Sequence, residues 1–201
     1  MLSNGINPIN ITTLQNSPKV GGDFINLEKV AASITLTKGM KVADFGSGAG
    51  YLGIIIAKII GDSGLLTALD IMESALDNVR ARAKAEGLEN IDTVRSNLEV
   101  LGGSGLRDES QNVVLLVNIL FESNKKEDII YESRRVLRPE GQLVVVDWKK
   151  GVYGFGPPDD LRIDPLSMRK MVESTGFEFV NNIDAGTFHQ GIVFKKIKIG
   201  N

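Results

Sequence analysis

The chain alternates short, continuously apolar runs with longer segments in which apolar residues recur every three or four positions. The first pattern is typical of strands buried on both faces, and the second is typical of amphipathic helices that cover a sheet. The apolar runs predict strands at 42–45, 65–70, 91–95 and 112–117, a fifth strand after Gly141, and two last strands at 177–180 and 191–197. The helical spacing predicts helices at 25–34, 51–60, 73–86, 125–137 and 164–175.

This order of elements predicts an α/β fold of the doubly wound type. Right-handed crossovers would give a mostly parallel, seven-stranded sheet with helices on both faces, ending in an antiparallel hairpin. A chain of 201 residues can bury roughly 70% of its unfolded surface as one domain. We expect residues 1–25, which are polar and include Pro8 and Pro18, to form an N-terminal arm or cap, and residues 26–201 to form a single domain.

A glycine-rich loop joins the first predicted strand to the next helix. Residues 44–50 read Asp-Phe-Gly-Ser-Gly-Ala-Gly, and the pattern continues to Gly53 as G-x-G-x-x-G, the dinucleotide signature. Glycines allow a sharp turn and close approach of a ligand, while the following helix offers N–H groups and a positive dipole end. The carboxylate of Asp44 would repel a pyrophosphate. We therefore expect a nucleotide-type cofactor with a free ammonium group and no phosphate, such as S-adenosylmethionine.

A second acid, Asp70, ends the second predicted strand. A carboxylate at this point can accept hydrogen bonds from both hydroxyls of a ribose. This holds for a nicotinamide dinucleotide as well as for S-adenosylmethionine. Asp70 therefore indicates a ribose without selecting the cofactor.

These motifs resemble the class I S-adenosylmethionine-dependent methyltransferases of the small-molecule type. The resemblance covers about residues 24–198 and is most specific at 135–143, Arg-Val-Leu-Arg-Pro-Glu-Gly-Gln-Leu. That stretch is similar to the helix, turn and fifth strand of the ubiquinone and menaquinone biosynthesis methyltransferases. The resemblance implies a Rossmann-like fold, S-adenosylmethionine as cofactor, and methyl transfer by in-line displacement to a small molecule.

Ligands of a doubly wound sheet lie beyond the carboxyl ends of its strands. Ser96, Asn97 and Leu98, after the third strand, should form the adenine pocket, although Asn97 stands where the family often has an aspartate and could also cap a helix. Asn118 ends the fourth strand and should lie near the methionine moiety. The expected cofactor-binding residues are Asp44, Gly46, Ser47, Gly48, Gly50, Asp70, Ile71, Asn97, Leu98 and Asn118.

The acceptor side is predicted at residues 148–164, where a loop rich in glycine, proline and aromatic residues follows the fifth strand. Such a loop at the rim of a site is either a substrate wall or a plain connection. Tyr153, Phe155 and Arg162 are the candidate substrate contacts, and Phe24 of the N-terminal arm could close the other side.

Methyl transfer from a sulfonium requires mainly positioning and exclusion of water, and a base only where the acceptor must lose a proton. Asp147 and His189 are the candidates for such a base. Asp147 ends the fifth strand and could instead cap the loop that follows. His189, the only histidine, lies near a turn, where a lone histidine is usually structural or solvated.

The composition limits the classes of partner and of chemistry that we expect for this chain. A net charge of −2 offers no strong field for nucleic acid, and the absence of cysteine excludes thiol nucleophiles, cysteine-ligated zinc, iron–sulfur clusters and disulfides. We expect no metal site. The longest apolar run, 54–60, is interrupted by Lys58 and is too short to span a membrane, and no signal peptide is visible. We expect a cytoplasmic protein with no membrane partner, and the apolar last strands could form a homodimer edge.

Other functions stay open at this point. Asn118-Ile119-Leu120-Phe121 has the N-x-x-F spacing of the amino-methylating motif without its two prolines, which would suit an N-methyltransferase acting on nucleic acid or protein. The glycine pattern would also suit an NAD(P)-dependent oxidoreductase, but Tyr131 has no lysine four residues later. A binding module without catalysis is a third possibility. Oxygen, nitrogen and carbon acceptors are all compatible with this framework.

Overall fold

The structure is a computed structural model of the chain, and it describes residues 25–198. The predicted N-terminal arm, with Phe24, therefore lies almost entirely outside the described residues. The described strands are β1 (Lys41–Phe45), β2 (Leu65–Asp70), β3 (Ile91–Arg95), β4 (Gln111–Val117), β5 (Leu137–Trp148), β6 (Phe177–Ile183) and β7 (His189–Lys196). The described helices are α1 (Leu27–Ala32), α2 (Tyr51–Ile60), α3 (Glu73–Ala85), α4 (Lys126–Val136) and α5 (Pro165–Ser174).

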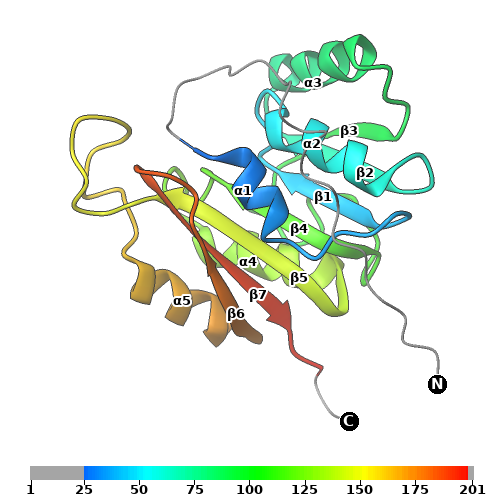
Figure 1. Cartoon of the computed structure of the whole chain (residues 1–201). Helices are drawn as coiled ribbons and strands as arrows, with labels where there is room; N and C mark the ends of the chain where they lie inside the picture. Colours follow the sequence, from blue (N-terminus) through cyan, green and yellow to red (C-terminus); the bar gives the residue numbers. More distant parts are fainter. Residues whose placement is uncertain (1–24, 199–201) are drawn as a thin grey trace, which may run out of the picture.

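The strands form one seven-stranded sheet in the order β3-β2-β1-β4-β5-β7-β6 within the described residues (Figure 1). β1 to β5 pair in parallel, and β7 runs antiparallel to both β5 and β6. The sequence order reverses between β1 and β4, which makes the carboxyl ends of these two strands the switch point of the sheet. The predicted doubly wound fold with a closing antiparallel hairpin is confirmed.

Helices cover both faces of the sheet because strand residues alternate between two hydrophobic cores. In β4, Val113 and Leu115 join the core beneath α1 and α2, whereas Val114 and Leu116 join the core beneath α4 and α5. All four side chains are fully buried. Figure 1 shows α1, α2 and α3 on one side of the sheet and α4 and α5 on the other. The continuous apolar runs therefore reflect strands buried on both faces.

The predicted turn before the fifth strand is wrong in its details. β5 begins at Leu137, directly after α4, and continues through Pro139 and Glu140. The residue in the left-handed conformation is Glu140, with φ of 67°, and not Gly141. Gly141 is needed for close packing instead, since a Cβ there would lie 2.9 Å from the carbonyl oxygen of Arg138. The exposed Arg138-Pro139-Glu140 segment breaks the apolar pattern, so this half of the strand has no periodic signal.

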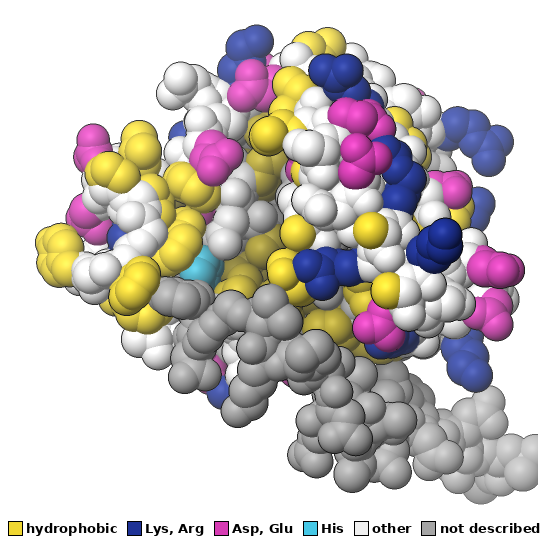
Figure 2. Space-filling model, turned by 90° about the horizontal axis from the view of Figure 1, so that it is seen from above, with side chains coloured by type: hydrophobic (Ala, Val, Ile, Leu, Met, Phe, Trp, Pro, Cys, Tyr) yellow, Lys and Arg dark blue, Asp and Glu magenta, His cyan; other side chains and the backbone are white. Residues whose placement is uncertain are grey.

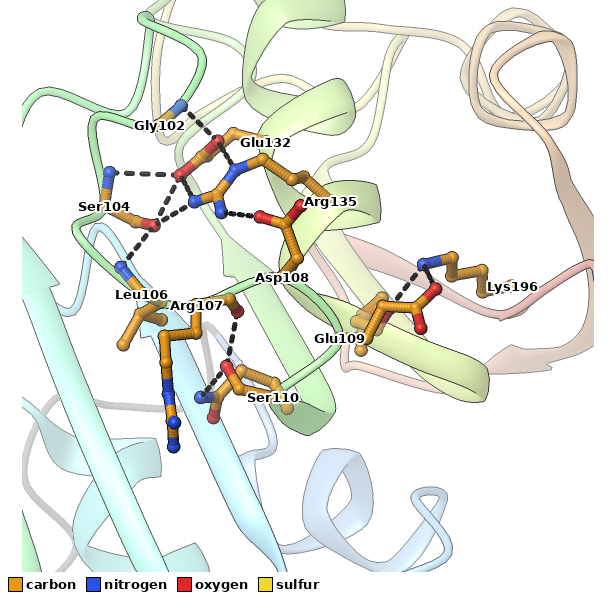
Figure 3. A network of polar contacts seen from close by, with 12 residues as sticks. Gly102, Ser104, Leu106, Arg107, Asp108, Glu109, Ser110, Glu132, Arg135 and Lys196 are labelled. Atoms are coloured by element: carbon orange, nitrogen blue, oxygen red, sulfur yellow. Dashed lines mark hydrogen bonds and ion pairs between the residues drawn. The ribbon is translucent and has the colours of Figure 1, made fainter.

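A buried ion pair fixes the loop that precedes β4 (Figure 3). The carboxylate of Glu132 has no exposed surface and accepts hydrogen bonds from the Gly102 and Ser104 amides, at 2.7 and 3.1 Å, and from the Ser104 hydroxyl. Arg135 donates to the same carboxylate through Nε and Nη2 and also pairs with Asp108. Burial alone would raise the pKa of Glu132, but these hydrogen bonds lower it to about 2.

Glu132→Gln should therefore lower the free energy of unfolding by about 3 kcal/mol, because it leaves a largely buried arginine without its main partner. The pKa of Glu132 is lower in the folded protein than in the unfolded chain, so its contribution is present above pH ~4.5 and is lost as the pH falls toward 2. Urea unfolding at pH 7 and pH 3 tests both points. Glu173→Gln, which removes a partly exposed pair between Glu173 and Arg169 one turn apart on α5, is the matched control and should cost less than about 0.5 kcal/mol. Equal losses in the two variants would contradict the assignment.

Candidate functional site

A cavity of about 640 Å³ opens at the carboxyl ends of β1, β2, β3 and β4. It is lined by the glycine loop, by residues 70–72 after β2, by residues 96–99 after β3 and by residues 117–119 at the end of β4. Ile25 and Leu27 close part of it from the α1 side. A hollow floored by hydrophobic side chains is visible from above in Figure 2. The size is that of a pocket for a nucleotide-sized ligand.

The glycines of the loop serve two different purposes. Gly46, Gly48 and Gly50 all have positive φ, of 70°, 50° and 75°. A Cβ on Gly46 would lie 2.7 Å from Ile119, and one on Gly50 would lie 2.8 Å from Val79, so these two glycines allow the loop to pack. A Cβ on Gly48 would meet no protein atom within 4 Å. Gly48 therefore leaves open space beside the cavity, where a ligand can approach the backbone.

Three amides of this loop donate to β2 and not into the cavity. The Gly46 and Ser47 N–H groups donate to the Leu69 carbonyl at 2.8 and 3.0 Å, and the Gly48 N–H donates to Oδ2 of Asp70 at 2.9 Å. Because these three amides are already engaged, they are not available to hold a phosphate.

Asp44 is a buried acid that lines the cavity and has no hydrogen-bond partner among residues 25–198. Only 4% of its surface is exposed, and no described residue donates a hydrogen bond to its carboxylate. Burial, together with the nearby charge of Asp70, raises the pKa of Asp44 to about 7. Buried charges in proteins are paired, and an unpaired carboxylate at a cavity wall is matched by a ligand that brings a cation. An ammonium group meets that requirement.

The Asp70 carboxylate lies at the cavity and accepts two backbone amides. Its Oδ1 accepts the Met72 amide and its Oδ2 accepts the Gly48 amide, each at 2.9 Å. Each carboxylate oxygen has a further lone pair that can accept a hydroxyl. The adjacent Ile71 and Met72 line the cavity with 59% and 61% of their surfaces exposed, which provides apolar area for a flat ring. Leu98, which is buried, lines the same cavity.

Three polar atoms at the cavity have no hydrogen-bond partner among residues 25–198. They are Oγ of Ser47, Oγ of Ser96 and Oδ1 of Asn118, and all three are buried. Asn118 also holds a left-handed backbone, with φ of 55°. Buried polar atoms are nearly always hydrogen-bonded, so this group indicates the positions of ligand donors and acceptors. Together with the open space at Gly48 and the unpaired Asp44, these atoms fit S-adenosylmethionine.

Asn97 lines the cavity but already has a structural role. Its Oδ1 accepts the Glu99 amide at 3.0 Å, which caps the turn that follows β3.

Two contacts that join distant segments around the cavity were not predicted from the sequence. The Ser123 hydroxyl donates to Glu99 at 2.6 Å across the cavity rim, and Arg82 donates to the Ala49 carbonyl at 3.0 Å. These pairs lie 24 and 33 positions apart, and no local pattern predicts them.

The structure gives Arg162 contacts that differ from the predicted substrate contact. This arginine is 5% exposed and donates to four backbone carbonyls, those of Lys149, Val152, Phe155 and Pro157. It therefore braces the loop after β5 and does not line the cavity. Tyr153 and Phe155 are 77% and 56% exposed on the same loop, and neither lines the cavity.

Neither candidate base lines the cavity. Asp147 is 1% exposed, and its carboxylate accepts the amides of Phe121 and Trp148. His189 is 1% exposed, and its ring packs against Trp148 with 4.1 Å between the ring centroids.

Within residues 25–198 no helix has both the length and the apolar character needed to cross a membrane. The same residues contain no group of three or more histidines and carboxylates arranged to hold a metal ion.

Comparison with known proteins gives a consistent result. A family model described as a methyltransferase domain matches residues 36–174. The ubiquinone/menaquinone biosynthesis C-methyltransferase UbiE of Shewanella halifaxensis is 33% identical over 191 residues, covering 78% of this chain and 75% of that protein. The arsenite methyltransferase of Halobacterium salinarum is 28% identical over 163 residues; the match covers 74% of this chain but only 40% of that protein.

Comparison with solved structures also finds a methyltransferase with a similar fold. The crystal structure of a SAM-dependent methyltransferase from Aquifex aeolicus aligns with a TM-score of 0.80 at 23% identity, over 96% of this chain and 100% of that chain. The matched family model spans most of the sheet and every part of the cavity that follows β1, β2, β3 and β4. The chain therefore belongs to the methyltransferase-domain family, as a class I S-adenosylmethionine-dependent methyltransferase.

Proposed function

We propose that the protein transfers the methyl group of S-adenosylmethionine to a small organic acceptor, with Asp44 as the group that selects the cofactor's cationic end. The observation that carries the proposal is the buried Asp44 carboxylate, which has no partner among the described residues and faces the cavity. A hydride-carrying dinucleotide would place a phosphate near this acid, whereas an amino-acid ammonium would neutralise it.

The other residues of the cavity would hold the rest of the cofactor. Asp70 would accept the ribose hydroxyls, and Ile71 with Leu98 would flank the adenine. Oδ1 of Asn118 would accept from the methionine end. Bound here, the cofactor supplies an electrophilic methyl group. The chain's own residues would fix its orientation and exclude water from the reacting atoms.

The two kinds of relative suggest different acceptors, and this chain favours the organic one. Arsenic(III) is a soft centre that prefers thiolate ligands, and the chain has no cysteine. The described lining of the cavity contains Asp44, Asp70, Glu99 and Glu122 and no lysine, arginine or histidine. A polyanion such as nucleic acid would be repelled by this lining, so we favour an uncharged or cationic small molecule.

The acceptor class is testable with methyl-labelled S-adenosylmethionine and three probes: a naphthoquinol that lacks the ring methyl group, arsenite, and a mixed RNA sample. We expect label in the quinol and none in arsenite or RNA, and we expect Asp44→Ala to abolish the transfer. Label in arsenite would overturn the argument from cysteine. Label in RNA would instead support the N-methyltransferase alternative built on Asn118 and Phe121.

The homodimer stays a prediction. β6 is an edge strand of the described sheet, but it carries Glu178, Asn181 and Asn182, and a register shift separates Phe179 from Asn181. Polar side chains and irregular pairing are features that discourage edge-to-edge association. Light scattering of the purified protein would decide between monomer and dimer. We also retain the prediction that the protein acts in the cytoplasm.

A further inference from the structure

The segment Asn118–Phe121 forms a wall of the cofactor cavity next to β5. Asn118 and Ile119 line the cavity, and Ile119 packs so closely on the glycine loop that a Cβ on Gly46 would lie 2.7 Å from it. The left-handed backbone of Asn118, with φ of 55°, turns the chain away from the direction of β4. Asparagine adopts this conformation more readily than most non-glycine residues, which suits Asn118 to this turn.

Two hydrogen bonds fasten this segment to β5. The Asn118 amide donates to the Val146 carbonyl at 2.8 Å, and the Phe121 amide donates to Oδ2 of Asp147 at 3.1 Å. The first bond continues the pairing of the two strands. The second has no counterpart in a regular sheet, because a side chain replaces the backbone as acceptor. Asp147 thus fixes the far end of a segment whose near end carries the unpartnered Asn118 oxygen.

The other oxygen of the same carboxylate fixes the start of the acceptor side. Oδ1 of Asp147 accepts the amide of Trp148 at 2.8 Å. The indole of Trp148 packs against His189 on β7, and Gly156 packs so tightly on it that a Cβ there would lie 2.5 Å from the ring. One carboxylate therefore ties the wall of the cofactor cavity to the residue on which the loop after β5 rests.

We propose that Asp147 is a positioning residue, which holds Asn118 and Ile119 against the cofactor through the backbone of Phe121. Both of its oxygens are engaged by backbone amides, 1% of its surface is exposed, and it does not line the cavity. These features suit a structural acceptor and not a base that must reach a substrate proton. The proposal requires cofactor binding but no particular acceptor, so it stands or fails separately from the proposed reaction.

Asp147→Asn tests the proposal, because asparagine keeps the shape but presents an N–H group where one of the two amides needs an acceptor. We expect the affinity for S-adenosylhomocysteine, measured by titration calorimetry, to fall about tenfold. Asn118→Ala should weaken binding as well. The double variant should lose less than the product of the two single losses, since both act through the same segment.

Asn90→Ala is the matched control for a general loss of stability. Asn90 is buried, precedes β3 at the opposite end of the sheet, and donates to the Ala57 and Gly61 carbonyls at 2.9 Å. It should lower the melting temperature without changing the affinity for S-adenosylhomocysteine. Unchanged affinity in Asp147→Asn, or an equal loss in Asn90→Ala, would overturn the proposal. If Asp147→Asn does not fold, Asp147→Glu displaces the carboxylate by one methylene and should weaken binding in the same assay.

Discussion

Asp70→Ala should reduce the affinity for S-adenosylhomocysteine by at least about 100-fold, since two charge-assisted hydrogen bonds to a ribose contribute about 1.5–3 kcal/mol each. The same substitution also removes the acceptor of the Gly48 and Met72 amides, at 2.9 Å each, and so loosens the turn that shapes the cavity. Titration calorimetry measures the loss directly. Asp70→Asn, which keeps one acceptor oxygen, should show an intermediate affinity.

Asp77→Ala is the control for this experiment. Asp77 lies on α3 with its side chain 68% exposed and pairs with Arg80 at the surface. Its removal should leave the affinity for S-adenosylhomocysteine within about twofold, as is usual for an exposed pair. An Asp70→Ala protein that is folded and binds as tightly as the parent would show that the ribose lies elsewhere. Tight binding of NAD by the parent would contradict the assignment of the cavity to S-adenosylmethionine.

The affinity for S-adenosylhomocysteine should also increase with pH up to about pH 7 and then level off. Asp44→Asn should remove this dependence of the affinity on pH. Burial raises the pKa of Asp44 to about 7, so below that pH most empty sites carry a neutral acid. The ligand's ammonium requires the charged form, and binding must therefore release a proton. The affinity should fall by up to about tenfold for each pH unit below 7.

The sign of the effect on stability is the opposite for the empty protein. Because the pKa of Asp44 is higher in the folded protein than in the unfolded chain, the folded protein binds its proton more tightly. The free energy of unfolding should then fall as the pH rises from about 4 to about 7.

Titration calorimetry of S-adenosylhomocysteine binding, in two buffers of different ionisation enthalpy, counts the proton that binding releases. An affinity independent of pH between 5.5 and 8 would show that Asp44 does not contact the ammonium.

The fold was accessible from the sequence because its strands are buried on both faces and its helices are amphipathic. Those patterns are local, and they located β2, β3 and α2 with their correct bounds. The ends of elements were less accessible where tertiary contacts override the pattern. Residues 138–140 near the start of β5 are exposed and interrupt its apolar pattern, and β6 continues through Asn181 and Asn182 because β7 pairs with it.

The candidate site likewise contains residues that the sequence predicted and residues whose contacts only the structure shows. Asp44 and the glycine loop form one continuous motif, and Asp70 follows at the end of the next strand, so chemistry and spacing together predicted the cavity that they line. The role of Arg162 could not be predicted, since its partners are backbone carbonyls that have no sequence signature. Asp147 is a similar case: the sequence places it at a strand end, but only the structure shows which amides it accepts.

The way Arg162 holds the loop after β5 affects how this enzyme can diversify. The guanidinium donates to four main-chain oxygens and lies 5.6 Å from the centre of the Trp148 ring, and a carbonyl is the same whichever residue carries it. The path of the loop therefore depends little on the Tyr153 side chain, which is 77% exposed, whereas the Phe155 ring packs edge-on against Phe188. Substitutions at Tyr153 can alter the chemistry presented by the loop while its shape persists. Variants of Tyr153 with Arg162 retained would therefore change the surface of this loop without changing its path.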